Sequence, residues 1–308
     1  ILYDPLTGKP DGSERVPFTG NRIPASRFEP ITQKIMAMVP KANLTSVNPE
    51  QNNFFVASPF MFNRWTDDIK LNWVASTNVN LFGRYSILDF DLRSPTAFGD
   101  ILEGPGLSGK SIASPGDSNG GTHSVSAGVN YIVRPNLLLD ANFGFVRQPT
   151  NMWSRSSNKN YGLEVLGIPG TNGPDMRYQG GTPRFDVGGY AQYGIANHYT
   201  PYYRIDDQFQ YVANATWSKS SHELRWGLDL YRQNMNHTQP EFVGGAGMGP
   251  RGRFVHGTGP TQLCQTPDGR GGCSRTSTYD SRANSFGTFL LGLPTQLGKC
   301  IMTLAPYT

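Results

Sequence analysis

The sequence predicts an all-β protein, namely a segment of an antiparallel transmembrane β-barrel with about seven or eight strands, open and curved, with long outer loops and one short helix. Three observations predict it. Apolar and polar residues alternate with a period of two, and the alternating runs come in pairs. Long connections rich in Gly, Pro and Asn separate the pairs. Of the 308 residues, 12% are aromatic and only 16% are charged, compared with about 25% in soluble domains.

The alternation defines six strands in three pairs. The runs cover residues 69–75, 79–87, 125–133, 137–145, 209–217 and 224–230. Short turns join the two runs of each pair near residues 76–78, 134–136 and 218–221. We expect a seventh strand at about Asn284–Leu293 and an eighth beginning near Cys300. A tilted strand crosses a bilayer with about 9–11 residues, whereas no stretch approaches the roughly 20 apolar residues of a membrane helix.

The connections between the pairs favour a membrane barrel over a soluble sandwich. Long loops are expected near residues 91–122, 148–204 and 234–282. Compact soluble domains rarely contain several such loops, whereas outer-membrane barrels have short periplasmic turns and long outer loops. In a sandwich, strands usually recur every 8–12 residues, and this spacing is absent. We divide the chain into an outer loop region, residues 1–66, with a short helix at Glu29–Val39, and partial barrel strands, residues 67–308.

The two faces of the strands receive different expected roles. In a membrane barrel the apolar face contacts lipid, and aromatic side chains gather at its two interfaces. The lipid-facing or interfacial candidates are Trp73, Tyr85, Tyr131, Phe143, Phe145, Tyr211, Trp217 and Trp226. The candidates for the opposite, lumen-facing side are Arg84, Asn130, Asp140, Asn142, Arg225 and Asp229. We expect these polar residues mainly to pair with one another, although some could line a solute path.

Charge and cysteine content narrow the function classes. The net charge of +4 is scattered, so no basic face for nucleic acid is predicted. Cys264 and Cys273 bracket a Gly-rich segment, which favours a disulfide in an oxidising compartment over two free thiols, and Cys300 has no predicted partner. No CxxC or paired His suggests a metal site. Gly104–Ser111 formally matches a phosphate-binding loop, but the residues after it cannot sustain a helix. We expect no catalytic residue, no cofactor and no enzyme activity.

Five strings, in this order and spacing, carry a resemblance to a known family. They are YDPLTG (Tyr3–Gly8), PFTGNRIPASRFEPITQKIM (Pro17–Met36), NNF (Asn52–Phe54), LFGRYS (Leu81–Ser86) and FLLGLPTQLGK (Phe289–Lys299). Together they resemble the barrel portion of TonB-dependent transporters of the Oar-like type, which are large receptors of the Gram-negative outer membrane. That family has a regulatory N-terminal domain, a plug and a barrel of about 22 strands.

The resemblance implies a role and partners. It implies that the chain is part of the barrel of a receptor that moves an unidentified solute across the Gram-negative outer membrane. The partners would be outer-membrane lipid and, through a plug on the parent chain, the TonB complex. No plug and no TonB box are found in this sequence, which starts at Ile1 and ends at Thr308, so we expect a fragment. The alternatives are an outer-membrane adhesin or structural surface protein, and a secreted carbohydrate-binding β-sandwich.

Overall fold

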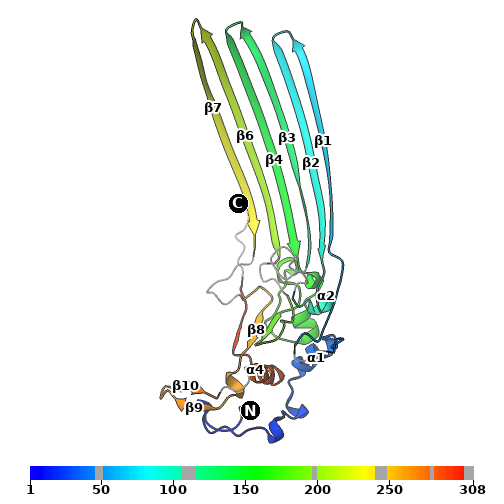
Figure 1. Cartoon of the computed structure of the whole chain (residues 1–308), viewed down its shortest axis with the longest axis vertical. Coiled ribbons are helices and arrows are strands. Elements are labelled where there is room, and N and C mark those ends of the chain that lie inside the picture. Colours follow the sequence, from blue (N-terminus) through cyan, green and yellow to red (C-terminus); the bar gives the residue numbers. More distant parts are fainter. Residues whose placement is uncertain (46–50, 106–115, 196–199, 240–247, 278–280, 302–308) are drawn as a thin grey trace.

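The computed structural model describes residues 1–45, 51–105, 116–195, 200–239, 248–277 and 281–301. Within this part of the chain, six long strands form a single sheet, and the remaining residues pack together at one end of it (Figure 1). We call the second part the loop body; it comprises the described residues of 1–60, 95–105, 154–201 and 239–301.

The sheet is an antiparallel meander in the order β1-β2-β3-β4-β6-β7. Its strands are β1 (Met61–Ser76), β2 (Val79–Ser94), β3 (Gly116–Arg134), β4 (Leu137–Trp153), β6 (Tyr202–Lys219) and β7 (His222–Thr238). Short turns at residues 77–78, 135–136 and 220–221 join β1 to β2, β3 to β4 and β6 to β7, and each lies inside one of the three expected turns. The sheet is not closed, since β1 and β7 pair with no further strand among the described residues.

The strands are longer than the alternation indicated. They contain 16 to 19 residues each. The sheet therefore includes residues that we expected in the loops at 91–122, 148–204 and 234–282 and in the outer region 1–66. Some of the added residues, namely Asp117–Thr122, are polar or Gly on both faces. A strand with no apolar face leaves no period-two signal, although its backbone still pairs.

The prediction of a seventh strand at Asn284–Leu293 is wrong, because residues 284–290 belong to helix α4 (Ser281–Leu290). Its buried residues include Asn284, Thr288 and Phe289, which have the spacing of one helical face. The strand expected near Cys300 is not found in the large sheet; the described strand closest to it in sequence is the short β11 (Gln296–Gly298), which belongs to a small sheet of the loop body, and residues 302–308 lie outside the described residues. The expected short helix is present as α1 (Pro30–Met38), with Pro30 in its first turn, where a missing N–H costs nothing.

The loop body has a hydrophobic core of its own. Its centre is formed by Ile35 of α1, Phe289 of α4, and residues of the β2–β3 and β4–β6 connections: Leu102, Leu166, Ile168, Phe185, Val187 and Tyr193. Two small sheets frame this core, one with β5 (Arg184–Val187), β8 (Arg253–His256) and β11 (Gln296–Gly298), the other with β9 (Cys264–Pro267) and β10 (Cys273–Thr276). The outer loops are therefore one packed unit.

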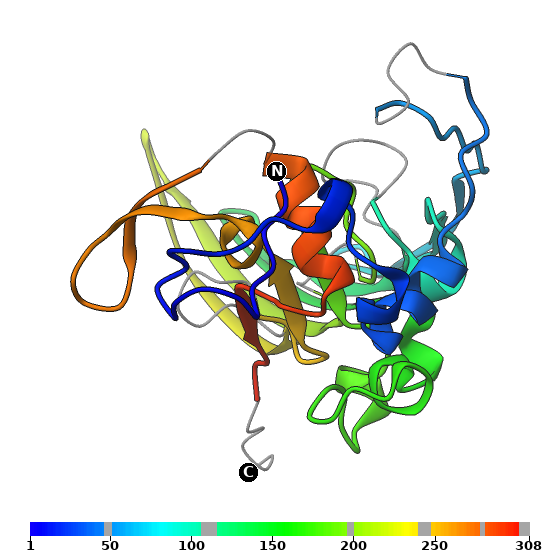
Figure 2. The ribbon, with the colours of Figure 1, turned by 90° about the horizontal axis from the view of Figure 1, so that it is seen from below.

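Further short elements complete the loop body, as Figure 2 shows from below with α4 at its centre. They are η1 (Thr19–Asn21), η2 (Ala25–Arg27), α2 (Gly99–Leu102), η3 (Arg155–Asn158), the π-helical η4 (Tyr161–Leu166), α3 (Met176–Gln179) and η5 (Gly259–Thr261). Helix α1 is tied to α4 by the Glu29 N–H, which donates to the Leu290 carbonyl at 2.9 Å.

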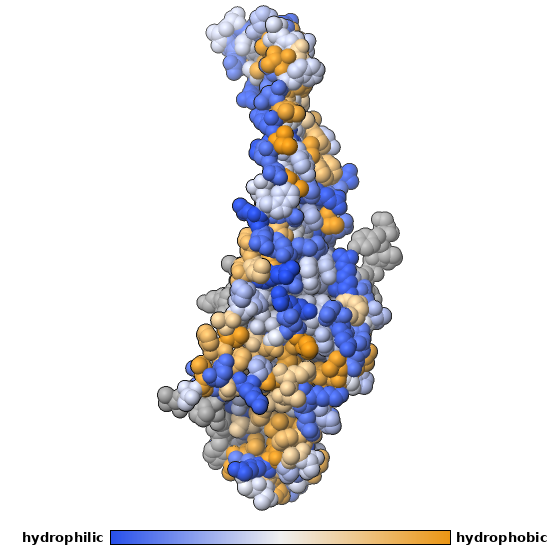
Figure 3. Space-filling model, turned by 90° about the vertical axis from the view of Figure 1, so that its right-hand side faces the viewer, coloured by the Kyte–Doolittle hydropathy of each residue, from blue (hydrophilic) through white to orange (hydrophobic). Residues whose placement is uncertain are grey.

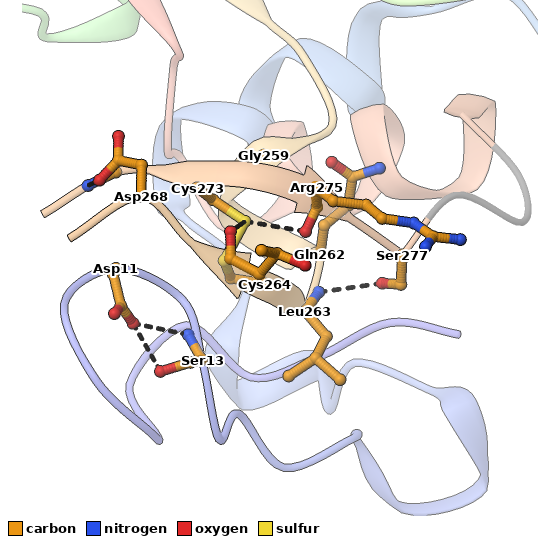
Figure 4. The surroundings of a disulfide bond; sticks show 12 residues. Asp11, Ser13, Gly259, Gln262, Leu263, Cys264, Asp268, Cys273, Arg275 and Ser277 are labelled. Carbon is orange, nitrogen blue, oxygen red and sulfur yellow. Dashed lines mark hydrogen bonds between the residues drawn. A yellow bond between two sulfur atoms is a disulfide. The ribbon is translucent and has the colours of Figure 1, made fainter. Parts of the chain in front are cut away.

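A disulfide joins Cys264 to Cys273 across the β9–β10 hairpin (Figure 4). The Cys264 N–H donates to the Gly12 carbonyl at 2.9 Å, and Arg15 donates to the Gln262 carbonyl at 2.7 Å. The hairpin is thus fastened to the N-terminal segment at Cys264, and the disulfide links this base to Cys273, the first residue after the turn.

Candidate functional site

The strand register places all six lumen-facing candidates on one face of the sheet. Directly opposed residues of antiparallel strands share a face. Asn130 opposes Asp140, Asn142 opposes Val212, and Val212 opposes Asp229. Arg84 opposes Ser126, which lies on the same face of β3 as Gly128 and Asn130. Arg225 opposes Thr216, which lies on the same face of β6 as Asn214. We call this the polar face.

Three charged candidates on the polar face, Arg84, Asp140 and Asp229, bond to neighbouring side chains. Arg84 donates to Asp68 at 2.9 Å, and the Ser86 hydroxyl donates to the same carboxylate at 2.7 Å. Asn214 donates to Asp140 at 2.7 Å, and Gln210 to Asp229 at 3.1 Å. These contacts support the expected structural role.

A further residue of the polar face, outside the six candidates, accepts several hydrogen bonds. Asp206, only 1% exposed, accepts hydrogen bonds from Arg204 at 2.8 Å and Gln233 at 2.7 Å. Its partners lie on β6 and β7, so only the register could reveal them.

The eight aromatic candidates lie together on the opposite, apolar face. Trp217 opposes Leu137, Tyr131 opposes Leu139, and Trp226 opposes Ala215, all within a few residues of the short turns, as is Trp73. Phe143 contacts Tyr211 with ring centroids 5.2 Å apart, and Phe145 contacts Phe209 at 4.9 Å. Tyr85 lies in the row of Phe145, farther from the turns. The aromatic side chains are therefore spread over the length of an apolar band.

No second layer of protein covers this face in the described part of the chain. Trp73 is 65% exposed and Leu228 is 58% exposed, although both are large and apolar. Figure 3, which views the sheet from the side of β1, shows hydrophilic residues gathered along one side of the upper strands and hydrophobic residues along the other. A soluble β-sandwich would bury these residues between two sheets, so that alternative is excluded.

The apolar band ends within one row of residues on the side toward the loop body. It covers about nine residues of each central strand, as at Val125–Val133, which is about 30 Å of strand and about 23 Å across a bilayer when tilted. The next row on the same face holds His123, Arg147 and Asp207, and Arg147 pairs with Asp207 at 3.2 Å. The strands thus continue beyond the continuous apolar band, and in their outer parts polar and apolar side chains are mixed, as in the ring contact of Phe62 with Phe90.

Within the loop body, two buried charges hold three connections together. Glu103, fully buried, accepts from the Ser156 N–H at 2.9 Å and from the Ser154 hydroxyl. Arg251, 1% exposed, donates to the carbonyls of Gly180 and, at 2.9 Å, Thr200. Burial lowers the pKa of Arg251 to about 10, and the nearby Glu103 charge acts against this shift. Arg251 is therefore still charged at neutral pH.

The loop body also carries an aromatic groove of about 890 Å³ between α1, α4 and the segments at residues 51–56, 97–105 and 189–193. Tyr190 contacts Phe286 with centroids 5.3 Å apart, and Phe98 contacts Tyr193 at 5.9 Å. Asn52 and Arg282 add polar groups to its wall. Sequence reasoning did not find this groove, because its residues come from segments far apart in the chain.

Other chemistry is not visible in the described residues. They hold no group of three or more His, Cys, Asp or Glu side chains placed for a metal ion. None of their helices is long and apolar enough to span a membrane. Most of the phosphate-loop-like string, from residue 106 onward, lies outside them.

The single-layer antiparallel sheet, with one apolar and one polar face, defines a wall segment of a transmembrane β-barrel. A family model described as outer membrane beta barrel domain matches residues 1–303, and the chain belongs to this family. The protein is accordingly located in the Gram-negative outer membrane. The comparisons match no curated protein and no solved structure.

Proposed function

We propose that this chain forms part of the wall and outer loops of a TonB-dependent transporter that moves a solute across the outer membrane. The observation that carries the proposal is the aromatic groove in a loop body mounted on the barrel wall. The groove has the volume and the mixed aromatic and polar lining of a solute site. The Oar-like sequence strings support energy coupling through TonB.

The proposal assigns a part to each surface. The apolar face contacts outer-membrane lipid, and the polar face lines the interior, where charges avoid the penalty of hydrocarbon. The short turns face the periplasm and the loop body faces outside, as is general for such barrels. The TonB complex would act through a plug on the parent chain. No covalent chemistry is assigned to the chain.

Uptake by living cells tests the proposal. A strain lacking the gene is complemented with the wild-type gene, and uptake is measured for two radiolabelled probes, an oligopeptide mixture and an oligosaccharide mixture. Complementation should restore uptake of at least one probe, and deletion of tonB should abolish that gain. Phe286→Ala should reduce uptake severalfold, whereas Trp226→Ala, on the lipid-facing surface, should not.

An adhesin is the second candidate, because the loop body stands beyond the apolar band and presents the β9–β10 hairpin at its margin (Figure 1). Uptake that is unchanged by complementation, together with a loss of cell attachment in the deletion strain, would favour adhesion and contradict transport. Attachment that is unaffected by the deletion would speak against the adhesin.

A further inference from the structure

A hollow of about 420 Å³ lies on the outer part of strands β1 to β4, between the apolar band and the loop body. We call it the wall pocket. It shares no lining residue with the aromatic groove. Gly120 and Gly121 of β3 belong to its lining, and a β-carbon on Gly121 would collide with the Leu88 carbonyl of β2. In the row of Gly121, β3 therefore contributes backbone and no side chain, which leaves room for a ligand.

Two rows of opposed residues supply the aromatic and polar lining of the wall pocket. The first row consists of Trp65, Asp89 and Gly121. The second row, one step closer to the loop body, consists of Asn63, Asp91, Asn119 and Asn151. Tyr85 and Asp89 are four residues apart on β2 and so share a face of the sheet. The wall pocket therefore opens on the same face as the apolar band.

The chemistry of this lining matches a sugar ring. Trp65 is 49% exposed, and the electron-rich face of an indole attracts the C–H groups on the flat side of a sugar. The Asp89 carboxylate is exposed and can accept from hydroxyl groups, while the Asn63 amide can both donate and accept. Asn151 donates to the Asn119 side-chain oxygen at 3.0 Å, so two further amides lie side by side in the second row. One aromatic face and several hydroxyl partners are thus combined in one hollow.

The charge of the wall pocket favours a neutral sugar over a phosphate group. Asp89 and Asp91 both belong to its lining, and like charges repel, so a phosphate would be disfavoured beside them. Arg93 pairs with Asp91 at 3.6 Å, which offsets one of the two charges. Nδ1 of His123 bonds to the Tyr85 hydroxyl at 2.9 Å. The hydroxyl groups of a neutral sugar can donate charge-assisted hydrogen bonds to the carboxylates without this repulsion.

The height of the wall pocket favours a lipid with a tall headgroup. On β3, His123 and Asn119 lie two and six residues beyond Val125, the last apolar residue of the band. With the tilt of a barrel strand, the pocket lies about 5–16 Å beyond the hydrocarbon. The headgroup region of an ordinary bilayer is only about 5–8 Å thick on each side. A lipid that fills the pocket therefore needs a headgroup that rises above its phospholipid neighbours, as one built from sugar rings does.

We propose that the wall pocket binds the neutral sugar headgroup of a glycolipid whose acyl chains lie against the apolar band. The volume is within the range of ligand pockets, about 300–1,000 Å³. Trp65 packs against the sugar ring, and Asp89 and the asparagines accept and donate at its hydroxyl groups. The proposal shares with the proposed function only the assignment of the apolar face to lipid, and it does not depend on transport.

Two lipids with identical acyl chains test the proposal, namely monoglucosyl diacylglycerol and phosphatidylglycerol. The intact protein in detergent is titrated with each lipid, and bound lipid is measured by native mass spectrometry. Methyl glucoside, which has the sugar without the chains, serves as the free-sugar competitor. The variants are Trp65→Ala and Asp89→Ala. Their matched controls are Trp73→Ala, on the same face of β1 near the short turn, and Asp229→Ala, on the polar face.

Wild-type protein should bind the glucosyl lipid about tenfold more tightly than phosphatidylglycerol, which corresponds to one hydrogen bond to a charged group. Trp65→Ala and Asp89→Ala should each reduce this preference about fivefold or more, whereas the two controls should leave it unchanged. Equal affinity of the wild type for the two lipids would overturn the proposal, whatever the variants do. So would a Trp65→Ala result equal to that of Trp73→Ala. Methyl glucoside that displaces the lipid at equal concentration would show a site for free sugar, and the glycolipid would be rejected.

Discussion

The buried charges of the loop body provide the most demanding prediction. Arg251→Met removes the donors to the Gly180 and Thr200 carbonyls and leaves Glu103 without its nearby positive charge. About 1 kcal/mol for each of the two unsatisfied buried carbonyls, the lower end of the usual cost, and about 2 kcal/mol for the lost interaction with Glu103 give an expected loss of about 4 kcal/mol in the stability of the loop body. Glu103→Gln keeps the side-chain size and removes only the charge; its expected cost is about 2 kcal/mol, since the two charged groups are near but not in direct contact.

A double-mutant cycle separates charge coupling from the loss of hydrogen bonds. Once Arg251 is gone, removal of the Glu103 charge should cost almost nothing, so the double variant should lose about 4 kcal/mol instead of about 6. Hydrogen exchange of the Gly181 and Gly194 amides, which donate to Lys159 and Leu102, measures the opening of this region. Amides of β3 serve as the control. Costs that add within about 0.5 kcal/mol would show that the two charges are not coupled, and the reasoning would fail.

Three further predictions test other parts of the structure. Phe143→Arg, in the apolar band, should destabilise the protein in lipid by about 2–4 kcal/mol, whereas Asn142→Arg, next to it on the polar face, should cost less than about 1 kcal/mol; equal costs in urea titrations of the protein in liposomes would contradict the assignment of the faces. The Cys264→Ser/Cys273→Ser variant should lose about 2–3 kcal/mol of local stability, because a loop with a sequence separation of 9 is released, and limited proteolysis should cut the hairpin first; an unchanged digestion pattern would oppose this. Burial lowers the pKa of His256 to about 4 and favours its neutral form in the folded state, so loop-body stability should fall as pH drops from about 6.5 toward 4, by up to about 3 kcal/mol, and His256→Leu should flatten this dependence in hydrogen-exchange measurements.

The strands were predictable from the sequence where one face carries an unbroken row of apolar side chains and the other face is polar. Val125–Val133 and Leu137–Phe145 show a clear period of two, and their register followed from the short turn between them. Asp117–Thr122 belongs to the same strand as Val125, but its side chains lack contrast, so backbone pairing alone defines it. The placement of the six polar candidates on one face and the eight aromatic candidates on the other was predictable as well, because alternation assigns a residue to a face before its partner strand is known.

The loop body was not predictable, because its contacts join distant segments. α4 was mistaken for a strand since Phe289, Leu290 and Leu291 form a short apolar run, which periodicity alone cannot assign to a strand or a helix. The structure brings two of the recognised strings into contact, with Thr32 donating to the Phe289 carbonyl. Neither string could indicate this by itself, and the same is true of the Glu103 and Arg251 pair, whose charges are separated by about half of the chain.

The parts of the strands between the apolar band and the loop body determine how far the loop body lies from the bilayer. From His123 to Gly116, β3 rises about 20 Å beyond the last apolar row. In the proposed orientation, with the loop body outside the cell, these strand segments hold the aromatic groove about 20 Å away from the bilayer surface. Shortening the outer part of every strand by four residues would leave the apolar band intact and bring the groove about 13 Å closer to the bilayer.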